Sequence, residues 1–201
     1  MNRSATLLLV LFLASCGPPV PNLDSPGSTI VCFGDSITAG VGAGPGEAYP
    51  DLLARRLGAE VVNAGVPGDT AADGLARLDE VLDADPWLVV VELGGNDILR
   101  RVPPEQTEAA LRSILDRLLA ARVVPVLVEI EAPLAASYAK VFDRLDEAYD
   151  IPVVEDVLGD ILTDPALKSD TIHPNARGYE MLAEALVDEL EPIFEARRKL
   201  R

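Results

Sequence analysis

The stretch Ile30-Val31-Cys32-Phe33-Gly34-Asp35-Ser36 begins as an apolar run and ends in a polar turn. Four apolar or β-branched residues bounded by turn residues predict a buried β-strand. Gly34 then allows the chain to turn sharply, and Ser36 carries the first hydroxyl beyond the carboxyl end of that strand. Ligands of open α/β sheets bind at this edge, so Ser36 stands where a nucleophile is needed. Gly-Asp-Ser is also an ordinary loop tripeptide, so the interpretation depends on the rest of the chain.

Strand-like and helix-like segments alternate along the remaining sequence. Apolar runs predict strands, and apolar residues at helical spacing predict helices. The alternation predicts a three-layer α/β/α domain of the flavodoxin-like kind, with a five-stranded parallel sheet in the order 2-1-3-4-5. The expected strands are 30–33, 60–63, 87–93, 123–130 and 152–154, and the expected helices are 49–57, 70–82, 103–121, 137–149 and 175–197.

The composition limits the classes of function. The 201 residues are 49% hydrophobic, which suits one globular domain with a core of its own. The 17 basic and 33 acidic residues give a formal charge of −16. Nucleic acids and anionic membrane surfaces require a basic footprint, so this charge argues against both as general partners.

The amino terminus has the pattern of an export signal. Arg3 precedes the apolar run 7–13, and Leu13-Ala14-Ser15-Cys16 resembles the lipobox of bacterial lipoproteins. This resemblance implies a signal peptide over 1–15 and a lipid on Cys16, which would hold the protein at the bacterial cell envelope. An ordinary signal peptide or an uncleaved anchor is the alternative. The proline-rich part of 16–28 is expected to be a tether, with the domain spanning 29–201.

Cofactor binding finds little support in the sequence. Cys32 lies in a predicted strand and is expected to be a core residue. The glycine-rich segment Ala39–Glu47 follows the first strand but has neither the G-x-G-x-x-G spacing nor a Walker lysine. No cofactor is therefore expected, and the segment is a candidate for one wall of a substrate groove.

His173 is the only histidine of the chain, so any histidine base must be this residue. It stands in Asp170-Thr171-Ile172-His173-Pro174, where Asp170 could accept the Nδ1 proton and orient the ring. A surface loop in which Asp170 is merely solvated is an equally simple explanation of this pattern. One histidine with scattered carboxylates does not make a zinc site, so no metal is expected.

Two further residues follow predicted strands at the same edge of the sheet. Gly68 comes after the second strand and Asn96 after the third, and both could donate hydrogen bonds to an oxyanion. Each also has a structural explanation, Gly68 as a turn residue and Asn96 as a turn or capping residue. Their convergence with Ser36 favours an acyl-transfer site.

Four sequence blocks, in this order, carry a resemblance to a known family: Gly34-Asp35-Ser36, Gly68-Asp69-Thr70, Gly94-Gly95-Asn96-Asp97 and Asp170-x-x-His173-Pro174. They resemble the blocks of the SGNH hydrolases, also called GDSL esterases. The resemblance covers about 29–190 and is strongest with the bacterial arylesterase, acyl-CoA thioesterase and lysophospholipase branch. The absence of a G-x-S-x-G elbow agrees with it, since this family does not use one.

The resemblance implies a serine esterase that hydrolyses small carboxylic esters or thioesters through an acyl-enzyme. It implies that Ser36 is the nucleophile, His173 the base and Asp170 the carboxylate that orients it. The implied oxyanion hole consists of the Ser36 and Gly68 N–H groups and the Asn96 side chain. Segment 131–138, where related enzymes line the acyl pocket, is not clearly similar. We expect the enzyme to act as a monomer.

The sequence alone leaves three alternatives to this esterase open. A carbohydrate O-deacetylase would use the same residues with a shallow polar pocket, and a non-catalytic lipoprotein would keep the fold as a binding module. A flavodoxin-like cofactor binder lacks a phosphate motif. Arg100 and Arg101 follow the Asn96 block and are either a site for an anionic leaving group or solvated surface cations.

Overall fold

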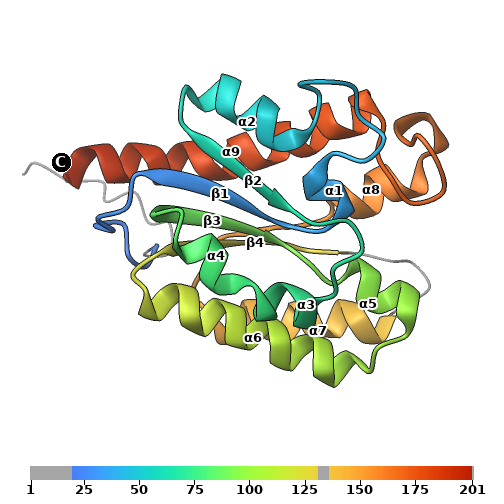
Figure 1. The fold of residues 1–201 in the computed structure, drawn as a ribbon, viewed down its shortest axis with the longest axis horizontal. Helices are drawn as coiled ribbons and strands as arrows, with labels where there is room; N and C mark the ends of the chain where they lie inside the picture. Colours follow the sequence, from blue (N-terminus) through green and yellow to red (C-terminus); the bar gives the residue numbers. More distant parts are fainter. Residues whose placement is uncertain (1–19, 131–135, 201) are drawn as a thin grey trace, which may run out of the picture.

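The computed structural model describes residues 20–130 and 136–200, and these form three layers (Figure 1). The central layer is a parallel sheet of five strands in the order β2-β1-β3-β4-β5, as the sequence predicts. The order follows from right-handed crossovers, which place successive strands first on one side of β1 and then on the other. The strands are β1 (Thr29–Gly34), β2 (Val61–Gly65), β3 (Pro86–Glu92), β4 (Val124–Val128) and β5 (Val153–Val154).

Helices cover both faces of the sheet. In Figure 1, α2, α8 and α9 lie on one side and α3, α4, α6 and α7 on the other. Every residue of β1, β3 and β4 is buried, which explains their nearly continuous apolar sequences. The helices are α1 (Ser36–Ala39), α2 (Tyr49–Leu57), α3 (Ala71–Ala76), α4 (Leu78–Leu82), α5 (Gly95–Arg100), α6 (Pro104–Ala120), α7 (Ala136–Ala148), α8 (Val157–Thr163) and α9 (Ala176–Leu200), with a 3₁₀ turn η1 (Pro165–Leu167).

The helix expected over 70–82 is interrupted in the structure. It is divided into α3 and α4 at Arg77, whose backbone is not helical (φ −109°, ψ 14°). The interruption lets the Arg77 side chain turn inward and donate to the carbonyl oxygens of Gly34 and Ala64, at 2.9 and 3.0 Å. The leucine spacing predicts a helix but gives no sign of these two carbonyl acceptors, which lie at the ends of β1 and β2.

Gly34 does not serve the purpose expected for it. It is paired within β1 and lies outside the positive-φ region, so conformational freedom is not the reason for a glycine here. A Cβ atom at this position would lie 2.0 Å from Thr38 Oγ1 and 2.8 Å from Glu92 Oε2. Gly34 therefore provides space for two neighbouring side chains.

The described part of the expected tether, 20–28, packs against the domain at the amino end of the sheet. Asn22 donates to two carbonyl oxygens at the α6–β4 connection, at 3.0 and 3.1 Å. The Arg197 side chain of α9 donates to the carbonyl oxygens of Leu23 and Gly27, each at 2.9 Å. The folded unit thus includes residues before Thr29, the expected domain boundary, because these contacts satisfy the backbone of a proline-rich segment that cannot form a helix. Residues 1–19, which contain the predicted signal peptide and Cys16, lie outside the described part.

None of the helices in the described ranges combines the length and the apolar character needed to cross a bilayer.

Candidate active site

Ser36 occupies the position predicted for it, directly beyond the carboxyl end of β1. It is the first residue of the one-turn helix α1 and is half-buried. The helix begins there because Asp35 Oδ1 accepts the Ile37 N–H at 3.0 Å and so caps the first turn. A buried strand and a capped turn thus hold the hydroxyl at the edge of the sheet.

His173 comes from the opposite end of the chain and meets Ser36 there. Its Nε2 atom lies 3.0 Å from Ser36 Oγ, and its Nδ1 atom lies 2.7 Å from Asp170 Oδ2. Asp170 Oδ1 also accepts the backbone N–H groups of Ile172 and His173, at 2.9 and 2.8 Å. Asp170 therefore holds both the ring and the loop that carries it, which excludes the alternative in which this carboxylate is only solvated.

The environment keeps the Asp170 carboxyl group ionised. The hydrogen bond from His173 and those from the Ile172 and His173 backbones lower its pKa to about 2. Asp170 is thus an acceptor for Nδ1–H at any pH near neutrality. This arrangement leaves Nε2 free to accept the Ser36 proton.

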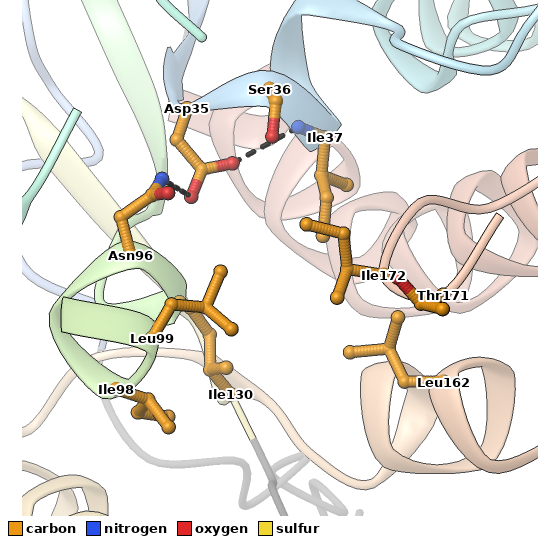
Figure 2. Close-up of a pocket in the computed structure, with 11 residues that line it drawn as sticks. Asp35, Ser36, Ile37, Asn96, Ile98, Leu99, Ile130, Leu162, Thr171 and Ile172 are labelled. Atoms are coloured by element: carbon orange, nitrogen blue, oxygen red, sulfur yellow. Dashed lines mark hydrogen bonds between the residues drawn. The ribbon is translucent and has the colours of Figure 1, made fainter. Parts of the chain in front are cut away.

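Asn96 enters the site from the first turn of α5, after β3. Its Nδ2 group donates to Asp35 Oδ2 at 2.8 Å and to the Asp69 carbonyl oxygen at 3.0 Å. These bonds fix the amide between the loops that follow β1 and β2, and Figure 2 shows the bond to Asp35. Gly68, the residue before Asp69, has a left-handed backbone (φ 92°) that favours glycine. The structure therefore brings Ser36, the Gly68 loop and Asn96 to one edge of the sheet.

An apolar pocket opens beside Ser36 (Figure 2). Most of its lining side chains are aliphatic, and Leu99 and Ile172 remain 57% and 38% exposed at its rim. The pocket is lined by Asp35, Ser36, Ile37, Gly95, Asn96, Ile98, Leu99, Ile130, Leu162, Thr171 and Ile172. The adjoining segment 131–135 lies outside the described residues. Such a surface suits a hydrocarbon chain better than a sugar.

Neither arginine considered for substrate binding lines this pocket. Arg100 donates to the Gly68 carbonyl oxygen at 2.5 Å and faces Asp73 at 3.6 Å. Arg101 ends α5 with a left-handed backbone and is exposed. The structure thus gives Arg100 a contact with the Gly68 loop, which neither interpretation of the sequence included.

Three residues around the site escaped the sequence analysis. Asp35 is 3% exposed and holds both α1 and Asn96. Arg77 joins the ends of β1 and β2 to Asp69. Glu92 is a fully buried carboxyl group beneath α1. The one available signal was Glu92 itself, an acidic residue inside an apolar strand.

The glycine-rich segment Ala39–Glu47, the candidate wall of a substrate groove, begins at the last residue of α1. The loop after α1 contacts α9, since the Val41 carbonyl oxygen accepts the Tyr179 hydroxyl at 2.8 Å, but it does not line the pocket. In the described ranges, no three His, Cys, Asp or Glu side chains are grouped so that they could hold a metal ion.

Comparisons with known proteins agree with this geometry. Residues 32–181 match the sequence model of the GDSL-like Lipase/Acylhydrolase family. The chain is 34% identical to thioesterase 1/protease 1/lysophospholipase L1 of Escherichia coli (strain K12), over 82% of this chain and 84% of that protein. It is 29% identical to an arylesterase of Vibrio mimicus, over 80% of this chain and 87% of that protein.

Solved structures show the same likeness. The crystal structure of TesA has a TM-score of 0.77 at 31% identity and covers 83% of this chain and 99% of that one. AlinE4, an esterase of the SGNH-hydrolase family, has a TM-score of 0.66 at 36% identity, covering 83% and 96%. With fold, site and sequence in agreement, the chain belongs to the GDSL-like lipase/acylhydrolase family and is a serine hydrolase of carboxylic esters or thioesters.

Proposed function

We propose that the protein hydrolyses acyl esters and thioesters through an acyl-enzyme formed on Ser36. The observation that carries this assignment is the continuous chain of contacts Ser36 Oγ–His173 Nε2 (3.0 Å) and His173 Nδ1–Asp170 (2.7 Å) beside an apolar pocket. Each atom of the chain has the acid–base character that its neighbour requires. An isolated serine would lack a base, and an isolated histidine would lack orientation.

The reaction proceeds in two steps. His173 Nε2 accepts the Ser36 proton as Oγ attacks the carbonyl carbon, and the protonated ring then gives this proton to the departing alcohol or thiol. Water attacks the acyl-enzyme in the second step, with His173 again accepting a proton, and Ser36 is regenerated. Asp170 remains ionised throughout and stabilises the imidazolium.

Three donors are placed to stabilise the oxyanion. They are the backbone N–H groups of Ser36 and Gly68, for which we find no hydrogen bond in the described part of the chain, and the Asn96 side chain. In the free site both Nδ2 hydrogens of Asn96 are donated, to Asp35 Oδ2 and to the Asp69 carbonyl oxygen, so Asn96 exchanges one of these bonds for the oxyanion when substrate binds. The two backbone donors are already oriented and need no reorganisation during the reaction, and an oxyanion donor is worth roughly 3 kcal/mol of the barrier.

The substrate class follows from the pocket wall. Aliphatic side chains on several sides of Ser36 favour an acyl chain longer than acetate, which argues against a carbohydrate O-deacetylase with a polar pocket. We therefore propose short- and medium-chain acyl esters, including thioesters, as substrates. The relatives named for thioesterase, lysophospholipase and arylesterase activity support esters and thioesters as the substrate class.

The test uses the purified protein with residues 20–28 retained and a series of p-nitrophenyl esters from acetate to laurate. Ser36→Ala and His173→Ala should each lower kcat by about 10³-fold or more while the fold remains intact. Ser113→Ala is the matched control, because the Ser113 hydroxyl donates to the Ala109 carbonyl oxygen within α6 and its loss should not affect turnover. Retained activity in Ser36→Ala would disprove the assignment. Acetate as the best substrate would support the deacetylase, and no Ser36-dependent hydrolysis of any ester would support a binding module.

We further propose that the protein is exported and held at the cell envelope by a lipid on Cys16. The support is the sequence Leu13-Ala14-Ser15-Cys16 after an apolar run of suitable length. The mass of the mature amino-terminal peptide tests this directly. A peptide with an unmodified Cys16 would refute it without affecting the assignment of the active site.

A further inference from the structure

Glu92 is a carboxyl group in the interior that the hydrolytic mechanism does not use. It is the last residue of β3, is 0% exposed and lies beneath α1. Its Oε2 atom accepts the Thr38 N–H at 3.2 Å and the Thr38 hydroxyl at 2.8 Å. Its Oε1 atom is also buried and has no hydrogen-bond partner among the described residues. A charged group in this position would be severely destabilised.

The surroundings of Glu92 favour its neutral form. In the described ranges it forms no ion pair, and burial together with the nearby Asp35 carboxylate raises its pKa well above the usual value. The next group along the network is Tyr49, whose hydroxyl lies 2.8 Å from Thr38 Oγ1. Because the Thr38 hydroxyl donates its one hydrogen to Glu92 Oε2, the Tyr49 hydroxyl is the donor to Thr38 Oγ1. The contact is thus a hydrogen-bonded network of uncharged groups.

The end of β1 is shaped to admit this contact. A Cβ atom on Gly34 would lie 2.0 Å from Thr38 Oγ1 and 2.8 Å from Glu92 Oε2. The Thr38–Glu92 hydrogen bond therefore lies in the space that a side chain at position 34 would fill. Gly34 and Glu92 pair in neighbouring strands, so the bond joins the ends of β1 and β3 to α1.

We propose that Glu92 is a positioning residue, which sets the location of Ser36 by fixing Thr38 and thereby α1 to the end of β3. Helix α1 is four residues long, too short to be stable through its own hydrogen bonds. Asp35 caps the first turn of α1 by accepting the Ile37 N–H, and Glu92 accepts the Thr38 N–H. Loss of the contact between Thr38 and Glu92 would let Ser36 Oγ move relative to His173 Nε2. A shift of about 1 Å can lower the rate on the order of 100-fold.

Glu92 does not itself act on the substrate. It has no exposed surface and is absent from the lining of the pocket. Its effect must therefore be on kcat through Ser36, with little effect on KM. The inference rests on the proposed role of Ser36 as nucleophile.

The test compares Glu92→Gln, Glu92→Leu, Thr38→Val and the double variant Thr38→Val/Glu92→Leu, using p-nitrophenyl butyrate. Glu92→Gln keeps an uncharged acceptor for Thr38 and should retain kcat within about threefold of the wild type. Glu92→Leu should lower kcat by about 10- to 100-fold with KM changed less than about twofold. Labelling of Ser36 by a fluorophosphonate should slow in parallel.

The double variant shows whether the two residues act through one contact. Its kcat should be close to that of Glu92→Leu alone, because the second substitution then removes only the bond between Thr38 and Tyr49 and no bond to Glu92. Leu118→Ala, in the core of α6, is the control for general loss of stability and should leave kcat unchanged. If Glu92→Leu does not fold, Thr38→Val removes the shorter of the two bonds between Thr38 and Glu92 from the other side and should by itself lower kcat.

Several results would overturn the proposal. They are an unchanged kcat in Glu92→Leu or in Thr38→Val, losses that multiply in the double variant, and an equal loss of kcat in Leu118→Ala. A wild-type enzyme without Ser36-dependent turnover would instead refute the proposed function, and this outcome is visible before any Glu92 variant is made.

Discussion

Replacing Arg77 by methionine tests how the ends of β1 and β2 are held beneath the active site. The guanidinium donates to Asp69 Oδ2 at 2.6 Å and to the carbonyl oxygens of Ala64 and Gly34 at 3.0 and 2.9 Å. It also lies 4.7 Å from the centre of the Phe33 ring. Methionine keeps much of the apolar stem but removes all of these polar contacts.

The expected cost follows from the burial of the ion pair. The Arg77 and Asp69 side chains are only 15% and 13% exposed, so the substitution leaves a nearly buried carboxylate without its cation. Breaking such a pair costs about 3–5 kcal/mol, a large part of the total stability of a domain. Unfolding in urea, followed by circular dichroism, measures the change in the free energy of unfolding.

Two companion variants make this measurement specific. Asp69→Asn combined with Arg77→Met should be more stable than Arg77→Met alone, since no uncompensated charge remains. Arg117→Met breaks an ion pair with Asp79 in which both side chains are well exposed, so it should cost no more than about 1 kcal/mol. A cost for Arg77→Met as small as that of Arg117→Met would refute the reasoning.

Further predictions concern pH, chain-length preference and the amino-terminal segment. Because burial raises the pKa of Glu92, the folded protein keeps a proton that the unfolded chain releases above about pH 4.3, and the contribution of Glu92 to stability declines by about 1.4 kcal/mol per pH unit as pH rises toward the folded-state pKa. The stability of Glu92→Gln relative to wild type should therefore increase with pH in urea titrations, and a difference independent of pH would contradict a neutral Glu92. Leu99→Ser should lower kcat/KM about tenfold for octanoyl esters, from roughly 1.4 kcal/mol of lost apolar contact, and leave acetyl esters unchanged; equal losses on both would show that Leu99 does not contact the acyl chain. Arg197→Met should cost about 2–3 kcal/mol in urea unfolding by releasing the carbonyls of Leu23 and Gly27, with kcat unaffected, and a large fall in kcat would contradict the separation of the two ends of the sheet.

The sequence predicted the sheet order because that order depends on local patterns and on the handedness of crossovers. Apolar runs identified the strands, and the structure confirms the parallel order β2-β1-β3-β4-β5. Long helices such as α2 and α6 were also located closely, since their apolar spacing is regular. The interruption at Arg77 was missed because its cause, two carbonyl oxygens on other strands, has no trace in the helical pattern.

The residues of the site divide in the same way. Ser36 and Asn96 follow predicted strands, and the structure places both at the edge where those strands end. His173 was predicted as the only histidine, just before the last helix, and it meets Ser36 at that edge. Glu92 was missed because its importance depends on the backbone of Thr38, 54 residues earlier in the chain. Gly34 was identified as a turn residue, whereas its purpose is to leave room for that contact. A motif therefore indicates which residues meet the substrate but not which residues support them.

The packing of 20–28 has a consequence for where the enzyme finds its substrates. These residues are fastened at the amino end of the sheet, whereas Ser36 lies at the carboxyl end, with the six residues of β1, about 20 Å, between them (Figure 1). If Cys16 carries a lipid, three residues separate Cys16 from Val20. A fully extended chain between these two residues spans at most about 14 Å. Vesicles bearing the lipidated protein should then hydrolyse a water-soluble ester far better than one buried in the same bilayer, and a 20-residue Gly/Ser insertion after Cys16 should remove the difference. An enzyme tethered in this way would act on esters dissolved in the water beside the membrane, with its active site directed away from the lipid that holds it.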